Sequence, residues 1–123
     1  MDHTVRFEKI CDEARSRIRE TTIDEIKERI ASGEELHLVD VREESEWEEG
    51  HLPGAVHLSK GIIERDIEEH FPDYSTEIVL YCGGGYRSAL AAETIEKMGY
   101  TDVFSMDGGW REWKAAGMPV EEG

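Results

Sequence analysis

The amino-acid sequence predicts an α/β domain with a mainly parallel β-sheet, and two observations lead to this prediction. Segments with the helical spacing of apolar residues alternate along the chain with short runs of apolar, β-favouring residues. The chain has 123 residues, which is enough for one domain around a single hydrophobic core. Hydrophobic residues make up 38% of the chain, and with its 12 glycines the apolar content matches that of ordinary folded domains.

An amphipathic helix is predicted at the start of the chain, over about residues 4–18, because five apolar residues recur there at helical spacing. Cys11 falls on the apolar face of this helix, so we expect its thiol to be buried rather than redox active. A second helix begins after Thr22, which forms a capping box with Glu25, and Gly33 suits its end.

The remaining elements continue the alternation. Further helices are predicted over residues 43–49, 61–70, 86–98 and 108–116. Strands are predicted over residues 36–41, 55–58, 78–81 and 103–106. The strand over residues 78–81 is the clearest, since it is short, fully apolar and rich in β-favouring side chains.

The charge balance excludes several functions. The chain carries 14 basic and 29 acidic residues, a net charge of −15, so we expect neither nucleic-acid nor membrane partners. It has no apolar run long enough to cross a membrane and no signal-peptide pattern, and its two cysteines make no disulfide scaffold, which together predict a cytoplasmic location. The five histidines lack ligand spacing and no Cys-x-x-Cys occurs, so neither a metal nor a cofactor is expected.

The candidate site follows the strand over residues 78–81. It consists of Cys82 and the loop Gly83, Gly84, Gly85, Tyr86, Arg87 and Ser88. Ligands of open α/β sheets bind beyond the carboxyl ends of strands, where Cys82 falls. The three glycines let the backbone curl through conformations closed to other residues and turn its N–H groups inward, while the following helix dipole and Arg87 add positive charge.

These features predict a reactive thiol. We expect the pKa of Cys82 to lie well below the ordinary ~8.5, so that it acts as a nucleophile without a general base. A buried structural cysteine beside a flexible turn is the plain alternative. A phosphate-binding loop is a weaker alternative interpretation of the three glycines, because the G-x-G-x-x-G spacing and the Gly-Lys-Ser/Thr ending are missing.

Three stretches of the chain resemble the rhodanese family of sulfurtransferases. The family's active-site loop and its two signatures are matched by residues 82–88, 40–58 and 108–113. The likeness covers about residues 20–120, so residues 1–18 are interpreted as a helical extension before a rhodanese-like domain over residues 19–123. The resemblance implies a three-layer fold, in which helices flank both faces of a five-stranded, mainly parallel sheet.

The resemblance also implies a chemistry. The family's catalytic cysteine maps onto Cys82, which would take a sulfane sulfur from thiosulfate or from a small-molecule or protein persulfide and hold it as a persulfide. The N–H groups of residues 83–88 would stabilise this anion. A thiol or cyanide then accepts the sulfur, with no cofactor. The identities of donor and acceptor and the oligomeric state stay open.

Two residues outside the loop are interpreted as its support. Asp40 and Arg42 lie at the end of a predicted strand, where they can hold the loop in place rather than react. Arg42 also lies four residues before Glu46 and can pair with it. Trp110 and Trp113 are expected to pack in the core.

Two other functions remain open. In the first, Cys82 is a persulfide carrier loaded by a partner protein. In the second, the domain is a phosphatase or arsenate reductase. Two features disfavour this function: the loop from Cys82 to Arg87 spans six residues, one fewer than in those relatives, and Tyr81 stands where the phosphatases have His.

Gly83 and Gly84 occupy positions where thiosulfate-preferring members of the rhodanese family often carry Arg or Lys, so a weak apparent affinity for thiosulfate is predicted.

Overall fold

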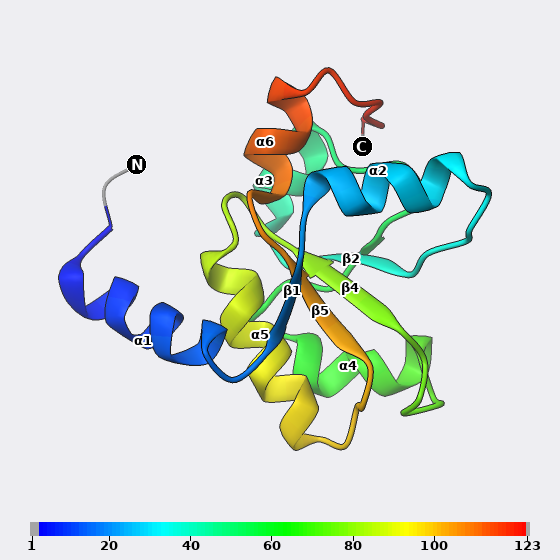
Figure 1. Cartoon of the computed structure of the whole chain (residues 1–123). Coiled ribbons are helices and arrows are strands. Elements are labelled where there is room, and N and C mark those ends of the chain that lie inside the picture. Colours follow the sequence, from blue (N-terminus) through cyan, green and yellow to red (C-terminus); the bar gives the residue numbers. More distant parts are fainter. Residues whose placement is uncertain (1–2, 123) are drawn as a thin grey trace.

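Helices and strands alternate along residues 3–122, which the computed structural model describes (Figure 1). The strands are β1 (Arg19–Thr21), β2 (Leu38–Asp40), β3 (Val56–His57), β4 (Ile78–Tyr81) and β5 (Val103–Met106). The helices are α1 (Val5–Arg15), α2 (Ile23–Ala31), α3 (Glu44–Glu49), α4 (Ile63–His70), α5 (Tyr86–Lys97) and α6 (Gly109–Ala115). None of the helices in this part of the chain is long and apolar enough to cross a bilayer.

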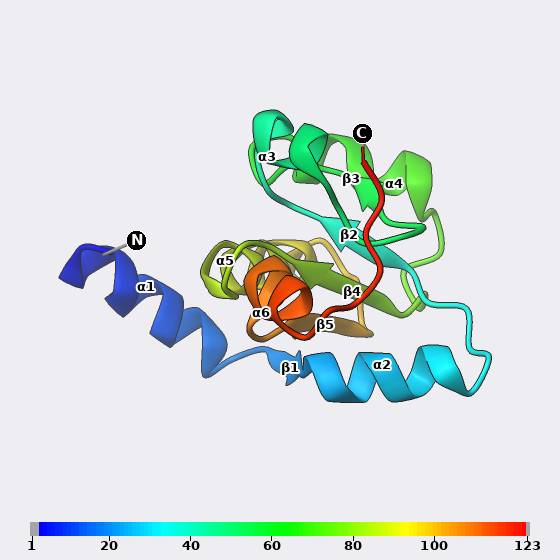
Figure 2. The same cartoon turned by 90° about the horizontal axis from the view of Figure 1, so that it is seen from above.

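The strands form one five-stranded sheet in the order β1-β5-β4-β2-β3, and every neighbouring pair is parallel. Figure 2 shows β1 and β3 at its opposite edges. The inner strands β2 and β4 are buried along their whole length, which explains their apolar character. The predicted fold class is therefore confirmed, including the helix at the start of the chain.

Strand β1 is the element that the apolar pattern missed. Its first two residues, Arg19 and Glu20, are exposed, and only Thr21 is buried. An edge strand pairs on one side only, so a three-residue segment can join the sheet without an apolar run. Helix α1 also ends at Arg15 rather than near residue 18, because the chain turns there to enter β1.

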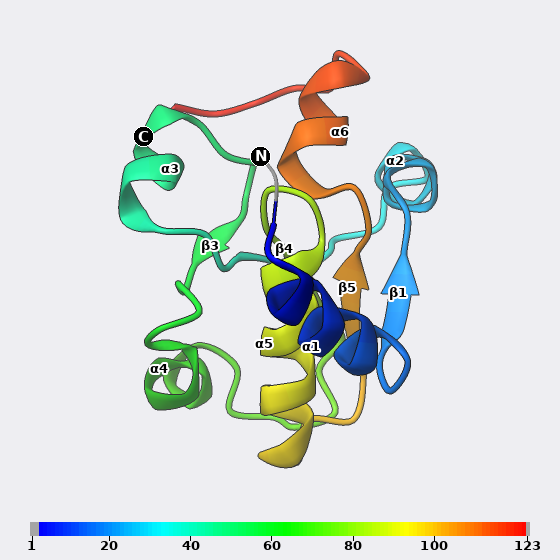
Figure 3. The same cartoon turned by 90° about the vertical axis from the view of Figure 1, so that its left-hand side faces the viewer.

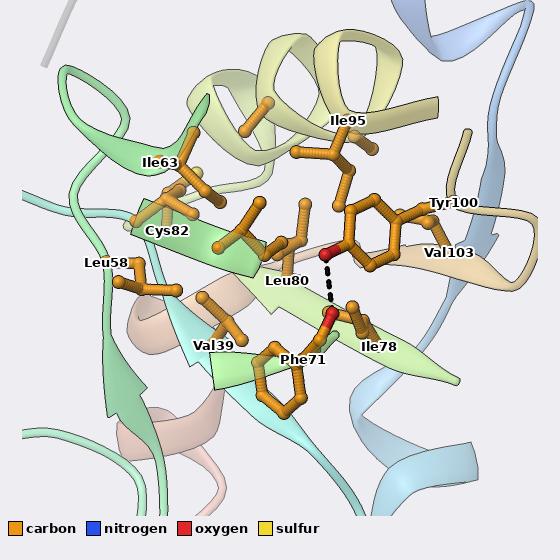
Figure 4. Close-up of a cluster of buried hydrophobic side chains, with 14 residues drawn as sticks. Val39, Leu58, Ile63, Phe71, Ile78, Leu80, Cys82, Ile95, Tyr100 and Val103 are labelled. Atoms are coloured by element: carbon orange, nitrogen blue, oxygen red, sulfur yellow. Dashed lines mark hydrogen bonds between the residues drawn. The ribbon is translucent and has the colours of Figure 1, made fainter. Parts of the chain in front are cut away.

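Helices cover both faces of the sheet, α2 and α6 above it and α4 and α5 below it in Figure 1. Figure 4 shows the core on the lower side, where Val39 and Leu80 of the sheet meet Ile63 of α4 and Ile95 of α5. On the other side Trp113 of α6 is buried in a second core cluster, as predicted. Trp110, by contrast, is only partly buried, so its predicted core position is wrong in part.

Helix α1 adds a further layer, since it packs against α5 rather than against the sheet (Figure 3). Cys11 and Ala14 on its inner face are buried, and the burial predicted for Cys11 is confirmed. At its end the Arg15 side chain binds Glu20 at 3.1 Å and Asp107, in the loop after β5, at 3.0 Å. These contacts fix α1 beside the carboxyl end of the sheet.

Because all strands are parallel, the loops after β2, β4 and β5 gather at one edge. The first turn of α6 is joined there to the loop after β4. The Trp110 N–H donates to the Cys82 carbonyl at 2.8 Å and the Arg111 N–H to the Gly83 carbonyl at 3.0 Å. Gly109, with φ +50°, permits this approach, because a side chain there would collide with the Cys82 carbonyl oxygen.

Candidate active site

The loop that starts at Cys82 runs from the end of β4 to the first turn of α5. Of its three glycines only Gly85 adopts a left-handed conformation, with φ +101°, and it forms the N-cap of α5. The expectation that Gly83 and Gly84 also need such conformations is wrong. Their missing side chains leave room instead, since a Cβ on Gly83 would lie 3.2 Å from an Arg87 nitrogen and one on Gly84 3.6 Å from an Arg111 nitrogen.

Backbone donors surround the sulfur of Cys82. The N–H of Gly85 lies 3.1 Å from Sγ and that of Ser88 3.4 Å, and both point to it. In the thiol form Sγ donates to the Ser88 hydroxyl at 3.5 Å. Within residues 3–122 these two are the loop amides that reach Sγ, fewer than the six expected to ring it. Partial positive charge at the start of a helix therefore lies directly against the sulfur.

A second hydroxyl lies behind Ser88. The Oγ atoms of Ser88 and Ser105 are 2.7 Å apart, and both residues are completely buried. When the sulfur is an anion, the Ser88 hydroxyl can turn to donate to it while accepting a hydrogen bond from the Ser105 hydroxyl. Sequence reasoning missed Ser105, although a serine within the predicted apolar strand over residues 103–106 was an available signal.

Arg87 is paired rather than free. Its guanidinium forms two parallel bonds with the Glu46 carboxylate of α3, at 2.7 and 3.0 Å. These bonds hold the pKa of Glu46 below its usual range. The predicted Arg42–Glu46 pair is therefore wrong, and the positive charge of Arg87 beside Cys82 is largely balanced by Glu46.

Asp40 and Arg42 form a buried ion pair next to the site. The Asp40 carboxylate accepts from the Arg42 side chain at 2.8–3.1 Å and from its backbone N–H at 2.9 Å. Arg42 also donates to the Gly50 carbonyl at 2.6 Å, and its guanidinium lies 4.6 Å from the centre of the Trp110 ring. Burial, with the charge of Asp40 nearby, raises the pKa of the Tyr81 hydroxyl. Because Arg42 contacts the Trp110 ring, the ion pair of Asp40 and Arg42 joins the end of β2 to α6.

Cys82 lines a pocket of about 380 Å³. The pocket is lined by Cys82, Gly84, Tyr86 and Arg87 of the loop, by Glu46 and Arg111, and by His3 and Phe7. Asp40 and Arg42 are not among these residues. The motif of the loop does not indicate Glu46, Arg111, His3 and Phe7 as lining residues, because they lie outside residues 82–88 and reach the pocket only in the folded chain. In the part of the chain that the structure describes, no three His, Cys, Asp or Glu side chains gather to hold a metal ion.

Fold and site together define a parallel α/β domain that presents one thiol, in a loop with inward-facing amides, at the carboxyl end of a central strand. This is the rhodanese-like class. The chain belongs to the rhodanese family, since the family model described as "Rhodanese-like domain" matches residues 22–116.

Relatives that are similar in sequence agree with this assignment. The chain is 37% identical over 98 residues to "Putative sulfur carrier protein YrkF" of Bacillus subtilis, a match covering 80% of the chain and 52% of YrkF. It therefore spans about half the length of that relative. It is 35% identical over 102 residues to "Putative sulfurtransferase YtwF" of the same organism, covering 83% of the chain and 96% of YtwF.

A solved structure extends the likeness over nearly the whole chain. It is a protein of unknown function from Rhodopseudomonas palustris, described as "Possible Tyrosine Phosphatase". It superposes with a TM-score of 0.82 at 32% identity, and the match covers 98% of this chain and 99% of that one. The likeness thus includes residues before the range that the family model matches.

Proposed function

We propose that this protein is a sulfurtransferase that moves a sulfane sulfur from thiosulfate or a persulfide donor to a thiol or cyanide acceptor. The observation that carries the proposal is the single pocket thiol, Cys82, whose sulfur faces the N–H groups of Gly85 and Ser88. Family membership and the sulfurtransferase and sulfur-carrier names of relatives support the same chemistry.

The reaction has two steps. The Cys82 thiolate attacks the outer sulfur of thiosulfate, a new S–S bond forms, and sulfite leaves with the electron pair of the broken bond. An acceptor thiolate or cyanide then attacks the outer sulfur of the Cys82 persulfide, and the Cys82 thiolate leaves. Each step exchanges one bond to sulfur for another, so neither a cofactor nor an external oxidant is needed, and ping-pong kinetics are expected.

The loop suits the intermediate. A persulfide on Cys82 extends into the pocket above Sγ and keeps its negative charge near the start of α5. The amides of Gly85 and Ser88 are already in place, so they need no reorganisation when the charge develops.

A persulfide carrier is the second candidate, and the name of YrkF favours it. In that case a dedicated partner loads Cys82, and turnover with free thiosulfate is incidental. The two candidates differ in one measurement, the steady-state rate with thiosulfate and cyanide alone. A carrier loads once under these conditions and turns over slowly.

Intact mass spectrometry tests the proposal. After incubation with thiosulfate, the wild-type protein is expected to gain the mass of one sulfur atom, and dithiothreitol or cyanide should remove it. Cys82→Ser should gain nothing, whereas Cys11→Ser, which removes the other buried thiol, should still gain it. The proposal would be contradicted if Cys82→Ser also gained the mass of one sulfur atom. Robust hydrolysis of para-nitrophenyl phosphate that requires Cys82 would contradict it as well.

A further inference from the structure

We propose that the aromatic rings of His3, Phe7 and Tyr86, together with Arg111 of α6, form a binding site for the organic part of a carboxylate-bearing, low-molecular-weight persulfide. The inference rests on the proposed function and names its donor class. The Cys82 thiolate would attack the outer sulfur of the protonated donor R–S–SH. The product would be the Cys82 persulfide, which keeps that proton, and R–S⁻ would leave with the electron pair.

Aromatic rings form one wall of the pocket. The ring of His3 lies 4.6 Å from that of Tyr86 and 5.0 Å from that of Phe7, and the Phe7 and Tyr86 rings are 6.1 Å apart. Phe7 belongs to α1, which lies against α5 (Figure 3), and its side chain lines the pocket. The family model begins at residue 22, so His3 and Phe7 add a wall from outside the matched range.

Arg111 is the cation of this pocket that is left for a ligand. Its guanidinium lies over Gly84, where a Cβ would be 3.6–3.7 Å from its atoms. Arg111 is exposed, and no carboxylate in residues 3–122 forms an ion pair with it. Arg87, the other arginine of the lining, is paired with Glu46. An anionic group entering the pocket therefore meets an unbalanced charge at Arg111.

The combination fits an organic anion better than thiosulfate. Thiosulfate has no carbon, so the faces of Phe7 and Tyr86 give it nothing to pack against. A donor with a carbon skeleton can cover these rings, place its carboxylate on Arg111 and direct its sulfur to Cys82 in the same pocket. The net charge of −15 repels anionic donors, and the positive charge of Arg111 offsets this repulsion locally at the pocket.

The test compares three donors in the loading of Cys82, followed by intact mass at timed intervals. The donors are glutathione persulfide, the persulfide of glutathione diethyl ester, in which both carboxylates are esterified, and thiosulfate. Arg111→Gln should raise the half-saturating concentration of glutathione persulfide roughly tenfold, equivalent to ~1.4 kcal/mol, with little change in the maximal rate. Loading by the ester should not change, and Arg111→Lys should restore part of the loss.

Phe7→Ala tests the aromatic wall. It should raise the half-saturating concentration of both organic donors severalfold and leave thiosulfate unaffected. Matched controls lie on the same helix, namely Arg6→Gln for the charge and Ile10→Ala for the apolar area, since both residues are exposed and outside the pocket lining. Phe7→Leu keeps an apolar side chain at this position, so it checks that a loss of donor loading in Phe7→Ala does not come from misfolding.

The outcomes separate this inference from the function on which it rests. Equal effects of Arg111→Gln and Arg6→Gln, or an equal loss with the diethyl ester, would overturn the assignment of Arg111. If Phe7→Ala affected loading by thiosulfate as much as loading by the organic donors, the role assigned to the aromatic wall would be overturned. If no donor loads wild-type Cys82, the proposed function itself fails.

Discussion

At the scale of single residues, the sulfur of Cys82 is held by groups of two kinds. The amides of Gly85 and Ser88 are fixed by the backbone, while the Ser88 hydroxyl can rotate and is backed by Ser105. The glycines and the arginine of the loop could be predicted from a local motif. The serine within the strand over residues 103–106 was visible in the sequence, but its contact with Ser88 could not be predicted, because the two residues meet only when α5 packs on β5.

Ser88→Ala should slow persulfide formation at Cys82 roughly 3- to 10-fold, since it removes one hydrogen-bond donor but keeps the backbone N–H. Ser105→Ala should give a smaller effect in the same direction, because it only frees the Ser88 hydroxyl to reorient. Timed intact mass measures both rates, with the exposed-loop variant Ser75→Ala as control. Wild-type rates in Ser88→Ala would show that the hydroxyl plays no part.

Glu46 makes stability depend on pH. Its pKa is lowered in the folded state, chiefly by the hydrogen bonds from Arg87, so its ionised form stabilises the fold. This contribution is complete well above the ordinary glutamate pKa of ~4.3 and is lost as the pH falls below it, through the lower folded value.

Glu46→Gln should therefore lose less stability than wild type between about pH 5 and pH 3, although it is less stable at pH 7. Urea unfolding midpoints across this range measure the difference. Parallel pH curves for the two proteins would show that the Glu46–Arg87 pair contributes nothing to the pH dependence.

At the scale of elements, the site depends on how the ends of neighbouring strands and helices are joined. The ion pair of Asp40 and Arg42 connects the end of β2 with the Gly50 carbonyl and the Trp110 ring, so its loss affects more than one element. Local patterns in the sequence predicted that these two residues support the loop, but they paired Glu46 with Arg42 instead of Arg87. A spacing of four within a helix is visible in sequence, whereas a contact over 41 positions is not.

Asp40→Asn should destabilise the fold by about 3–5 kcal/mol, because it leaves the buried Arg42 guanidinium without a counter-charge. The matched control, Arg17→Ala, breaks the exposed pair with Glu93 and should change stability little. Chemical denaturation measures both. A loss for Asp40→Asn no larger than that of the control would show that this pair does not hold the elements together.

At the scale of the whole molecule, the alternation of helices and apolar strands was enough to predict a parallel α/β sheet. The inner strand β4 was visible because both its faces are buried, and β1 was not, because Arg19 and Glu20 at the edge face water. The position of α1 was also beyond sequence reasoning. Its apolar face is plain from spacing, but the surface of α5 that receives it is assembled only in the folded chain.

The place of β1 has a practical consequence for anyone who trims this protein. A fragment cut to the range that the family model matches, residues 22–116, starts directly after β1 and lacks it entirely. The hydrogen-bonding groups of β5 that now pair with β1 would then be open to solvent. Such bare edges recruit strands from other molecules, so the shortened protein should self-associate, and its behaviour would misrepresent the intact chain.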